Sequence, residues 1–371
     1  MTRPRRLTVP RLLTVVGTRP QLIKYAALTG PLRAAFDEVL VDTGQHYDAA
    51  LAGDFFAELG LPTPDHTLAT RAAHVPAQLG RMLEGLGDLI TQVRPDVVLC
   101  LGDTTSTAAA ALAAHTLGVP LAHLEAGERN HRADGTRTPV RAQPEEANRV
   151  LADQLATLKL CVSTRALANL QAEGLGDGAV HTGDILYDLY RARRAADLAS
   201  ATLPASLGLA PGTYHFATCH RALNTDDPAR LGALVKALGA LGLPVVWPLH
   251  PRTHKMLDRF GFLAEAQRTL HLLPPVGHAD ALALGAHARR ILTDSGGVVR
   301  EAYFHGVPAV ILDDSTAWID LVESGWAVLA GADPARIQAA VDRPSPTHQP
   351  PFFGAGDAVP RTVAALQGLF A

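Results

Sequence analysis

Short apolar, β-branched runs alternate with Ala/Leu-rich helical stretches along almost the whole chain. In the first half these runs cover residues 12–18, 37–43, 96–102, 119–125, 158–164 and 179–183. In the second half they cover residues 214–219, 244–250, 269–273, 290–294, 307–312 and 326–330. Strand-length runs that alternate with helices predict βαβ units and parallel sheets. Because the rhythm occurs twice, the sequence predicts an α/β protein with two Rossmann-like, doubly wound domains and a central cleft.

The length of the chain also favours two domains. At 371 residues it exceeds the size at which single cores usually stop growing, about 250–300 residues. Between residues 184 and 212 a charged helical stretch is followed by a Pro/Gly-rich one, which marks a boundary. We predict a first domain over residues 1–187, a second over 188–355, and a final helix over 356–371 that packs back on the first domain.

Composition excludes several classes of function. A formal net charge of −3 gives no general attraction to nucleic acid or anionic membrane. No apolar run reaches the ~20 residues of a transmembrane helix, and no secretory signal is recognised. The chain has 3 cysteines, none in a CxxC motif, which we interpret as buried, reduced thiols of a cytoplasmic protein. Its histidines are scattered, so no metal site is expected.

Two carboxylates stand at the ends of successive predicted strands. Asp103 follows the run at 96–102, and Glu125 closes the run at 119–125. Parallel strands present their carboxyl ends at one edge of a sheet, where open α/β sheets bind ligands. A strand buried on both faces has no structural use for a charge at its tip. The acids are therefore either solvated at the rim of the sheet or take part in a reaction. Their presence on successive strands favours a role in a reaction.

The turn after the first predicted strand is a candidate phosphate site. Gly17 allows a tight turn into the next helix, and Arg19 and Lys24 lie near the start of that helix. Helix N-termini already favour anions. The alternative is that both cations are simply solvated on the helix surface. Neither a GxGxxG fingerprint nor a P-loop is present.

The segment at 292–302 gives a stronger anion signal. A strand ends at Asp294, and Ser295, Gly296 and Gly297 open a helix in which Glu301 follows. Glycines at this point let backbone N–H groups approach a phosphate, and the serine hydroxyl adds a donor. Glu301 is placed to accept hydrogen bonds from a ribose diol. An ordinary serine cap with packing glycines is the alternative.

Two further positions carry weaker signals. His220 ends the first strand of the second half and suits a diphosphate or acid–base work near neutral pH. Glu145 follows Pro144 at the start of a helix, which local rules explain as an ordinary helix start. Neither position alone distinguishes a functional residue from a structural one.

Taken together, the blocks GTRPQLIK, DTGQHYD, GDTTST, HLEAG, PEEANR, HPRT and LTDSGGVVREA, spread over residues 12–330, resemble the non-hydrolysing UDP-N-acetylglucosamine 2-epimerase family. The resemblance implies a fold of glycosyltransferase-B type, with the sugar and acid–base groups in the first domain and UDP in the second. It also implies a UDP-sugar substrate, no cofactor, a homodimer and a place in cell-surface polysaccharide synthesis.

The resemblance assigns roles to particular residues. The family's acidic trio matches Asp103, Glu125 and Glu145, with His220 as a further active-site group. Its substrate-binding residues match Arg19, Lys24, Ser295, Gly296, Gly297 and Glu301. Gln45 and His46 match a site near which bacterial members hold a second, activating UDP-sugar.

The implied reaction follows from the chemistry of the sugar. The proton at C2 of an N-acetylhexosamine is not adjacent to a carbonyl, so its simple removal would leave a very unstable carbanion. The family instead eliminates UDP across C1–C2 to give 2-acetamidoglucal, and adds UDP back after protonation on the other face of C2. Carboxylates serve as acid and base, and fixed cations stabilise the departing diphosphate.

The chain departs from the family pattern at four places, all expected on the cleft or its rim. Leu223 replaces a carboxylate in the HR-x-EN block, and STAWID at 315–320 replaces TTERPE. The loop at 128–141 is longer and more basic than usual, and GTRPE becomes GTRPQ at Gln21.

These departures keep other functions open. A hydrolysing relative would release UDP and N-acetylmannosamine with the same carboxylates. An epimerase of a diacetamido uronic acid nucleotide would use the basic loop for the added carboxylate, whose candidate ligands are Arg129, His131, Arg132, Arg137 and Arg141. A solvated basic loop is the plainer interpretation. An inactive UDP-sugar-binding protein would explain Leu223 and STAWID, and a glycosyltransferase fits the blocks less well.

Overall fold

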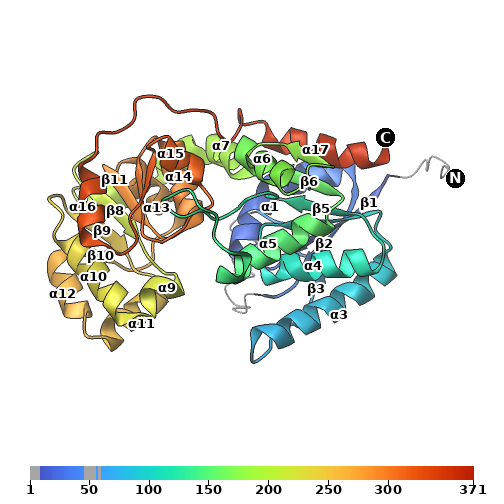
Figure 1. The fold of residues 1–371 in the computed structure, drawn as a ribbon, viewed down its shortest axis with the longest axis horizontal. Coiled ribbons are helices and arrows are strands. Elements are labelled where there is room, and N and C mark those ends of the chain that lie inside the picture. Colours follow the sequence, from blue (N-terminus) through green and yellow to red (C-terminus); the bar gives the residue numbers. More distant parts are fainter. Residues whose placement is uncertain (1–8, 46–55, 57–59) are drawn as a thin grey trace. The chain divides into compact units, whose positions relative to one another are not determined.

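The computed structural model describes residues 9–45, 56 and 60–371 (Figure 1). The chain forms two compact units, each assembled from separate stretches of sequence. The first consists of Met1–Arg129, Pro139–Leu189 and Pro351–Ala371, and the second of Asn130–Thr138 and Tyr190–Pro350. The sequence placed the divisions at 187/188 and 355/356, and it did not single out the short stretch 130–138.

The first unit contains a seven-stranded parallel sheet in the order β3-β2-β1-β4-β5-β6-β7. The strands are β1 (Arg11–Val16), β2 (Asp37–Asp42), β3 (His66–Thr67), β4 (Val97–Leu101), β5 (Leu121–Leu124), β6 (Leu158–Cys161) and β7 (Ala179–His181). Only β3 was not predicted, because a strand of 2 residues leaves no apolar run in the sequence.

The second unit contains a six-stranded parallel sheet in the order β10-β9-β8-β11-β12-β13. The strands are β8 (His215–Thr218), β9 (Val245–Pro248), β10 (His271–Leu273), β11 (Arg290–Thr293), β12 (Ala309–Ile311) and β13 (Ala327–Leu329). The predicted pair of doubly wound parallel sheets is therefore confirmed.

Helices connect the strands and cover the sheets. In the first unit they are α1 (Arg19–Ala35), α3 (Val75–Val93), α4 (Thr105–Thr116), η1 (Val140–Ala142), α5 (Pro144–Leu155), α6 (Thr164–Ala172), α17 (Ala358–Gln367) and η2 (Gly368–Phe370). In the second they are α8 (Leu203–Ser206), α9 (Ala222–Thr225), α10 (Pro228–Gly239), α11 (Pro251–Arg259), α12 (Leu263–Thr269), α13 (His278–Ala286), α14 (Gly296–His305), α15 (Ile319–Glu323) and α16 (Pro334–Asp342), while α7 (Ile185–Ser200) runs from one unit into the other. None of the helices in the described ranges is long and apolar enough to cross a membrane.

Alternation along β1 divides the first unit's core between the two faces of its sheet. Leu12 and Val16 belong to the cluster that α1 and α17 cover, whereas Leu13 and Val15 belong to the cluster that α3 and α4 cover. Successive side chains of a strand point to opposite faces, so an uninterrupted apolar run fills both. Helix α4 is buried almost all round, because its alanines let α3 and α5 approach closely.

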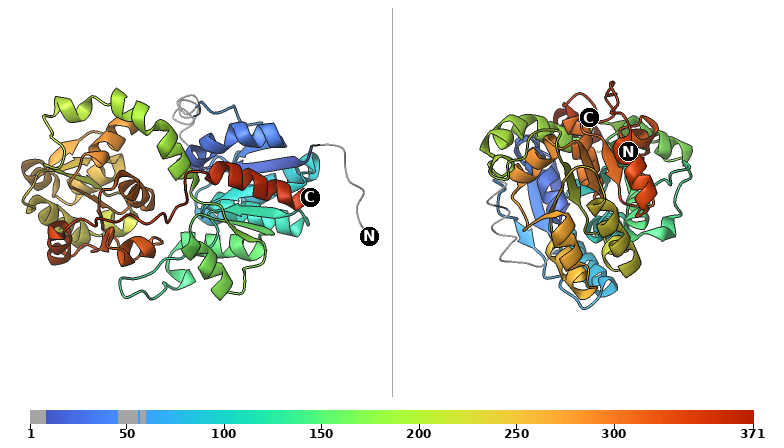
Figure 2. Two further views of the ribbon diagram at one scale, coloured as in Figure 1. Left: turned by 90° about the horizontal axis from the view of Figure 1, so that it is seen from above. Right: turned by 90° about the vertical axis from the view of Figure 1, so that its left-hand side faces the viewer.

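The C-terminal helix α17 packs against α1 in the first unit. Leu366 is fully buried in the cluster that also contains Leu28 and Leu32 of α1, and the ring of Phe370 meets Phe36 edge-on at 6.4 Å between centroids. Figure 2 shows this helix in red beside the blue elements of the first unit. The last 21 residues, Pro351–Ala371, thus complete a domain that begins the chain.

The strand order fixes where a ligand site is expected. In each sheet the order reverses between two neighbouring strands, β1 and β4 in the first unit and β8 and β11 in the second. Open parallel sheets bind ligands beyond the carboxyl ends of such strands. Four of the segments selected from the sequence follow these strands: Gly17–Lys24, Asp103, His220 and Asp294–Glu301.

Replacing Leu366 by Ala tests the packing of α17. Leu366 is fully buried, so Leu366→Ala should lower the free energy of unfolding of the first unit by about 2–5 kcal/mol, through lost burial and the cavity left behind. Leu117→Ala is the matched control in the same unit, because Leu117 is 46% exposed. Urea denaturation of both variants measures the difference. Equal losses would contradict the packing described for α17.

Candidate active site

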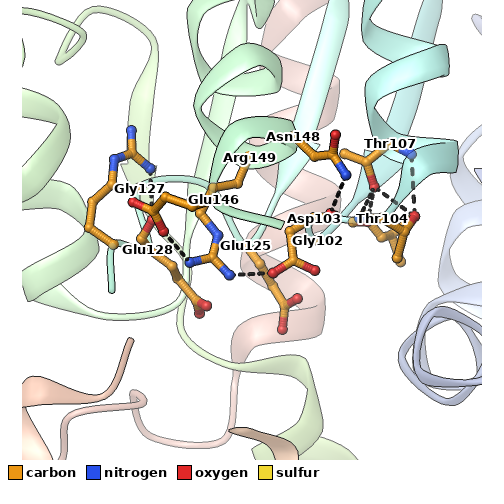
Figure 3. A network of polar contacts seen from close by, with 12 residues as sticks. Gly102, Asp103, Thr104, Thr107, Glu125, Gly127, Glu128, Glu146, Asn148 and Arg149 are labelled. Carbon is orange, nitrogen blue, oxygen red and sulfur yellow. Dashed lines mark hydrogen bonds and ion pairs between the residues drawn. The ribbon is translucent and has the colours of Figure 1, made fainter. Parts of the chain in front are cut away.

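Asp103 and Glu125 follow two hydrogen-bonded parallel strands. Leu101 of β4 pairs with Leu124 of β5, so the residues just beyond them stand at the same edge of the sheet. Figure 3 shows both carboxylates pointing away from this edge in the same direction. The structure therefore brings together two acids that are 22 positions apart in the sequence.

Arg149 of α5 is the cation that holds Asp103. Its Nη2 contacts Asp103 Oδ2, and its Nη1 donates to Glu146 Oε2 at 2.9 Å (Figure 3). The Asn148 amide donates to the Asp103 carbonyl at 3.0 Å. Burial alone would lower the pKa of Arg149, but the charges of Asp103, Glu128 and Glu146 outweigh it and raise that pKa. Arg149 thus neutralises an acidic cluster and fixes Asp103, whose side chain is 32% exposed.

Glu125 is paired with Lys24 from the first helix. Lys24 Nζ contacts Glu125 Oε2, and both side chains are buried. Gly102 leaves room for this pair, because a Cβ at Gly102 would lie 3.2 Å from Glu125 Oε2 and 3.6 Å from Lys24 Nζ. Lys24 is therefore not a solvated surface cation, because it is paired with Glu125 inside the first unit.

The backbone of Glu125 adopts a left-handed conformation. Its φ is +68°, and Arg94 at the end of α3 is the only other non-glycine residue of the described ranges with positive φ. Side chains disfavour this region by roughly 1–2 kcal/mol. The N–H groups of Glu125 and Ala126 both donate to the carbonyl of Leu160, which keeps the turn in place. Strain of this kind is common at functional sites.

The PEEANR block contributes differently from what the sequence suggested. Glu145 is exposed in the first turn of α5, whereas its neighbour Glu146 is completely buried against Arg149. Sequence analysis did not select Glu146, Asn148 or Arg149. The three-residue spacing of Glu146 and Arg149, which brings them together on a helix, was the available signal.

Two glutamines organise the loops around this edge. Gln21 is 1% exposed, its carbonyl accepts from the N–H groups of Gly17 and Thr18, and its amide donates to the carbonyl of Leu101 at 2.7 Å. The departure at this position lies inside the first unit and not at a rim, because Gln21 ties the first turn to the end of β4. Gln45 accepts from the N–H and hydroxyl of Ser106 at the start of α4. His46 lies outside the described residues.

In the second unit, Asp294 arranges the turn after β8. Its carboxylate, 2% exposed, accepts from the backbone N–H groups of His220 and Arg221 and from the Asn224 amide. The side chain of His220 remains 45% exposed, with Nδ1 3.6 Å from Asp294 Oδ1. Asp294 thus folds the turn so that a half-exposed imidazole stands at the carboxyl end of β8.

The glycine-bearing segment begins helix α14. Ser295 is the N-cap, and its hydroxyl oxygen accepts from Val298 N at 3.5 Å. A Cβ added to Gly297 would meet nothing closer than Ser295 Oγ at 3.9 Å. Burial raises the pKa of Glu301 to about 7, against the opposing effect of Arg300. The helix start thus offers backbone donors, and Glu301 changes charge near neutral pH.

Arg129 occupies a structural position. Its side chain is fully buried, donates to Asp153 Oδ2 at 2.6 Å and makes two bonds of 2.7 Å to the carboxylate of Glu173. The sequence suggested a substrate contact for this residue, but its guanidinium is committed to these two acids. The partners come from α5 and from the end of α6, which residue type and position alone did not reveal.

Two of the departures from the family pattern meet in the second unit. The N–H and carbonyl of His131 exchange hydrogen bonds of 2.8 and 2.9 Å with the backbone of Thr316, so the basic loop pairs with the STAWID segment. Trp318 is buried, with the Arg300 guanidinium 4.5 Å from its ring centroid. Leu223, in contrast, is 42% exposed on α9. In the described part of the chain, no three His, Cys, Asp or Glu residues could hold a metal ion.

Comparison with known proteins identifies one family. The family model of UDP-N-acetylglucosamine 2-epimerase matches residues 32–367. A UDP-N-acetylglucosamine 2-epimerase homologue of Methanococcus maripaludis is 35% identical, over 97% of this chain and all of its own. The UDP-2,3-diacetamido-2,3-dideoxy-D-glucuronate 2-epimerase of Pseudomonas aeruginosa is 40% identical, over 87% of this chain and 88% of its own.

A solved structure shares the whole fold. Methanocaldococcus jannaschii UDP-GlcNAc 2-epimerase, in complex with UDP-GlcNAc and UDP, superposes with a TM-score of 0.85 and 30% identity, over 96% of this chain and 99% of that one. Two parallel-sheet units with paired acids beyond one sheet therefore define an α/β protein of glycosyltransferase-B type. The chain belongs to the UDP-N-acetylglucosamine 2-epimerase family, which is a family of isomerases.

Removing Lys24 tests the buried ion pair. Lys24→Met leaves Glu125 buried without its cation, so the free energy of unfolding should fall by about 3–5 kcal/mol. Lys24→Met combined with Glu125→Gln should recover much of this loss, because no unpaired charge remains. The exposed Lys236→Met is the control and should change stability by less than ~0.5 kcal/mol. A Lys24→Met variant as stable as the control would contradict the pairing.

Proposed function

We propose that this protein interconverts UDP-N-acetylglucosamine and UDP-N-acetylmannosamine by anti elimination of UDP and re-addition. A base removes the C2 proton while the C1–O bond to UDP breaks, which gives 2-acetamidoglucal and free UDP. Protonation of C2 on the opposite face and return of UDP to C1 then give the epimer. The observation that carries the proposal is the adjacency of Asp103 and Glu125, each beside its own cation.

The surroundings of the two acids suit this chemistry. Lys24 and Arg149 place a positive charge beside Glu125 and Asp103, and the two carboxylates are proposed as the groups that transfer the C2 proton. The left-handed backbone at Glu125 and the Asn148 contact behind Asp103 restrict where the carboxylates can move. Glu145, exposed at the start of α5, is proposed as the third acid that acts on the sugar.

The second unit supplies groups for UDP. The N-terminus of α14, with Ser295, Gly296 and Gly297, is proposed to bind the diphosphate through backbone N–H groups. Glu301 is proposed to accept hydrogen bonds from the ribose hydroxyls, and His220 to contact the departing diphosphate. Arg19, exposed at the start of α1, is proposed as a further phosphate ligand.

A second substrate is supported by one comparison. The relative named as a UDP-2,3-diacetamido-2,3-dideoxy-D-glucuronate 2-epimerase is 40% identical to this chain. A second protein of M. maripaludis, which is named UDP-N-acetylglucosamine 2-epimerase, is 33% identical. Such a substrate carries an added carboxylate, for which the basic loop offers Arg132, Arg137 and Arg141. The ratio of kcat/KM for the two nucleotide sugars decides between them, and appearance of free N-acetylmannosamine with UDP would instead identify a hydrolysing enzyme.

Replacement of each acid tests the proposed roles. Asp103→Asn, Glu125→Gln and Glu145→Gln should each lower kcat by roughly 10²–10⁴-fold, the usual contribution of a general acid or base. Product formation from UDP-GlcNAc, followed by NMR, measures the rates. Turnover left intact in all three variants would contradict the proposal.

Glu146→Gln and Glu84→Gln are the controls for this series. Glu146 is buried against Arg149, so its replacement should lower stability as well as activity. Glu84 is exposed on α3, and Glu84→Gln should leave both unchanged. If Glu145→Gln behaved like Glu84→Gln, the third acid would have to be sought elsewhere.

The raised pKa of Glu301 predicts a pH dependence of binding. Below its pKa of about 7 the carboxyl is protonated, and above it the carboxylate accepts from the ribose hydroxyls. The affinity for UDP-GlcNAc should therefore increase as pH rises through neutrality, and Glu301→Gln should remove the increase. Calorimetry on the Asp103→Asn background measures this without turnover. Affinity that falls with rising pH, or an increase that persists in Glu301→Gln, would contradict the role of Glu301.

Three further expectations stay predictions. These are a homodimer, a cytoplasmic location, and activation by a second UDP-sugar near Gln45 and His46. Light scattering of the purified protein measures the first directly. Gln45 accepts a hydrogen bond from Ser106 at the start of α4, and α4 begins two residues after Asp103. A ligand bound near Gln45 would therefore act on Asp103 through the start of this helix.

A further inference from the structure

His123 lies on β5, two residues before Glu125, and its ring contacts Gly102, the residue that precedes Asp103. The histidine is fully buried and uses both ring nitrogens. Nδ1 lies 2.7 Å from Asp153 Oδ1, and Nε2 lies 2.7 Å from the carbonyl oxygen of Gly102. The ring therefore joins α5 to the end of β4.

The partners of His123 determine its protonation state. A carbonyl oxygen only accepts, so Nε2 must carry a proton to bond with Gly102. Asp153 Oδ2 already accepts from Arg129 at 2.6 Å and from the N–H of Gly127 at 3.1 Å, which favours a carboxylate. Burial acts to raise the pKa of Asp153, but the charges and hydrogen bonds of His123 and Arg129 lower it. With an acceptor on each side, the ring is held between α5 and the residue after β4.

The ring joins a network of ion pairs. Asp153 pairs with Arg129, and Arg129 pairs in turn with Glu173. Buried charges are retained when each has a partner of opposite sign and its hydrogen bonds are satisfied.

The contact between His123 and Gly102 connects this network of side chains to the two acids. The Gly102 carbonyl belongs to the peptide group that leads into Asp103, and the N–H of Gly102 donates to the Leu124 carbonyl at 2.9 Å. Gly102 itself has a left-handed φ of +65°. His123 is also two residues before Glu125 on the same strand. One side chain thus sets the peptide before Asp103 relative to the strand that carries Glu125.

We propose that His123 is a positioning residue whose ring clamps the Gly102–Asp103 peptide and so holds Asp103 in register with Glu125. The proposal rests on the proposed function for its kinetic consequence, but not for the clamp itself.

Two variants separate the two contacts of the ring. His123→Gln places an amide donor near the position of Nε2 and keeps the bond to Gly102. His123→Asn places its amide near the position of Nδ1 and keeps the bond to Asp153. We expect His123→Asn to lower kcat roughly 10²-fold with little change in KM, as a displacement of about 1 Å in a catalytic group does.

His123→Gln should retain kcat within about tenfold of the wild type, although each variant loses one contact of the buried ring and unfolds at lower temperature. A purely structural histidine would make kcat fall equally in both, or more in the Gln variant, and either result would overturn the proposal.

Two measurements keep the proposal independent of the substrate. Nitrogen NMR of the protein labelled with ¹⁵N-histidine, assigned with His123→Gln, should show a proton on Nε2 of His123, as the bond to the Gly102 carbonyl requires. An Nε2 without a proton would overturn the clamp. Crystal structures should show the Gly102–Asp103 peptide displaced in His123→Asn and retained in His123→Gln. If the wild type turned over no UDP-sugar, the proposed function would fail, while these two results would still decide the role of His123.

Discussion

The guanidinium of Arg149 allows three carboxylates to share one edge of the first sheet. Asp103, Glu128 and Glu146 surround it, and its positive charge offsets their mutual repulsion. Arg149 reaches this edge because α5 begins beyond the end of β5 and runs back across the sheet. The acid at the tip of β4 therefore depends on a residue 46 positions later in the chain.

The two units use opposite charges to fix the residues beyond their central strands. Beyond β4 and β5, cations from α1 and α5 hold two carboxylates in place. Beyond β8 and β11, the buried carboxylate of Asp294 collects backbone N–H groups and shapes a turn that presents His220. The proposed acid–base groups therefore lie in the first unit and the proposed diphosphate-binding groups in the second.

Much of the fold could be predicted from sequence because parallel strands buried on both faces leave continuous apolar runs, and only the two-residue β3 left none. The acids at the ends of β4 and β5 were predictable for the same reason, since Asp103 and Glu125 directly follow such runs. The partners of the charged side chains could not be predicted from the sequence. Lys24 was assigned to phosphate but pairs with Glu125, and Arg129 was assigned to substrate but pairs with Asp153 and Glu173. Those pairs join distant segments, which local pattern does not encode.

We expect the carboxylates beyond β4 and β5 to move a proton at C2 of a UDP-linked 2-acetamido sugar. Incubation of the protein with UDP-GlcNAc in deuterium oxide, followed by proton NMR, measures this transfer. We expect deuterium at C2 together with the appearance of UDP-ManNAc, and loss of both in Asp103→Asn and Glu125→Gln. Formation of UDP-ManNAc without deuterium at C2, or unchanged exchange in both variants, would contradict it.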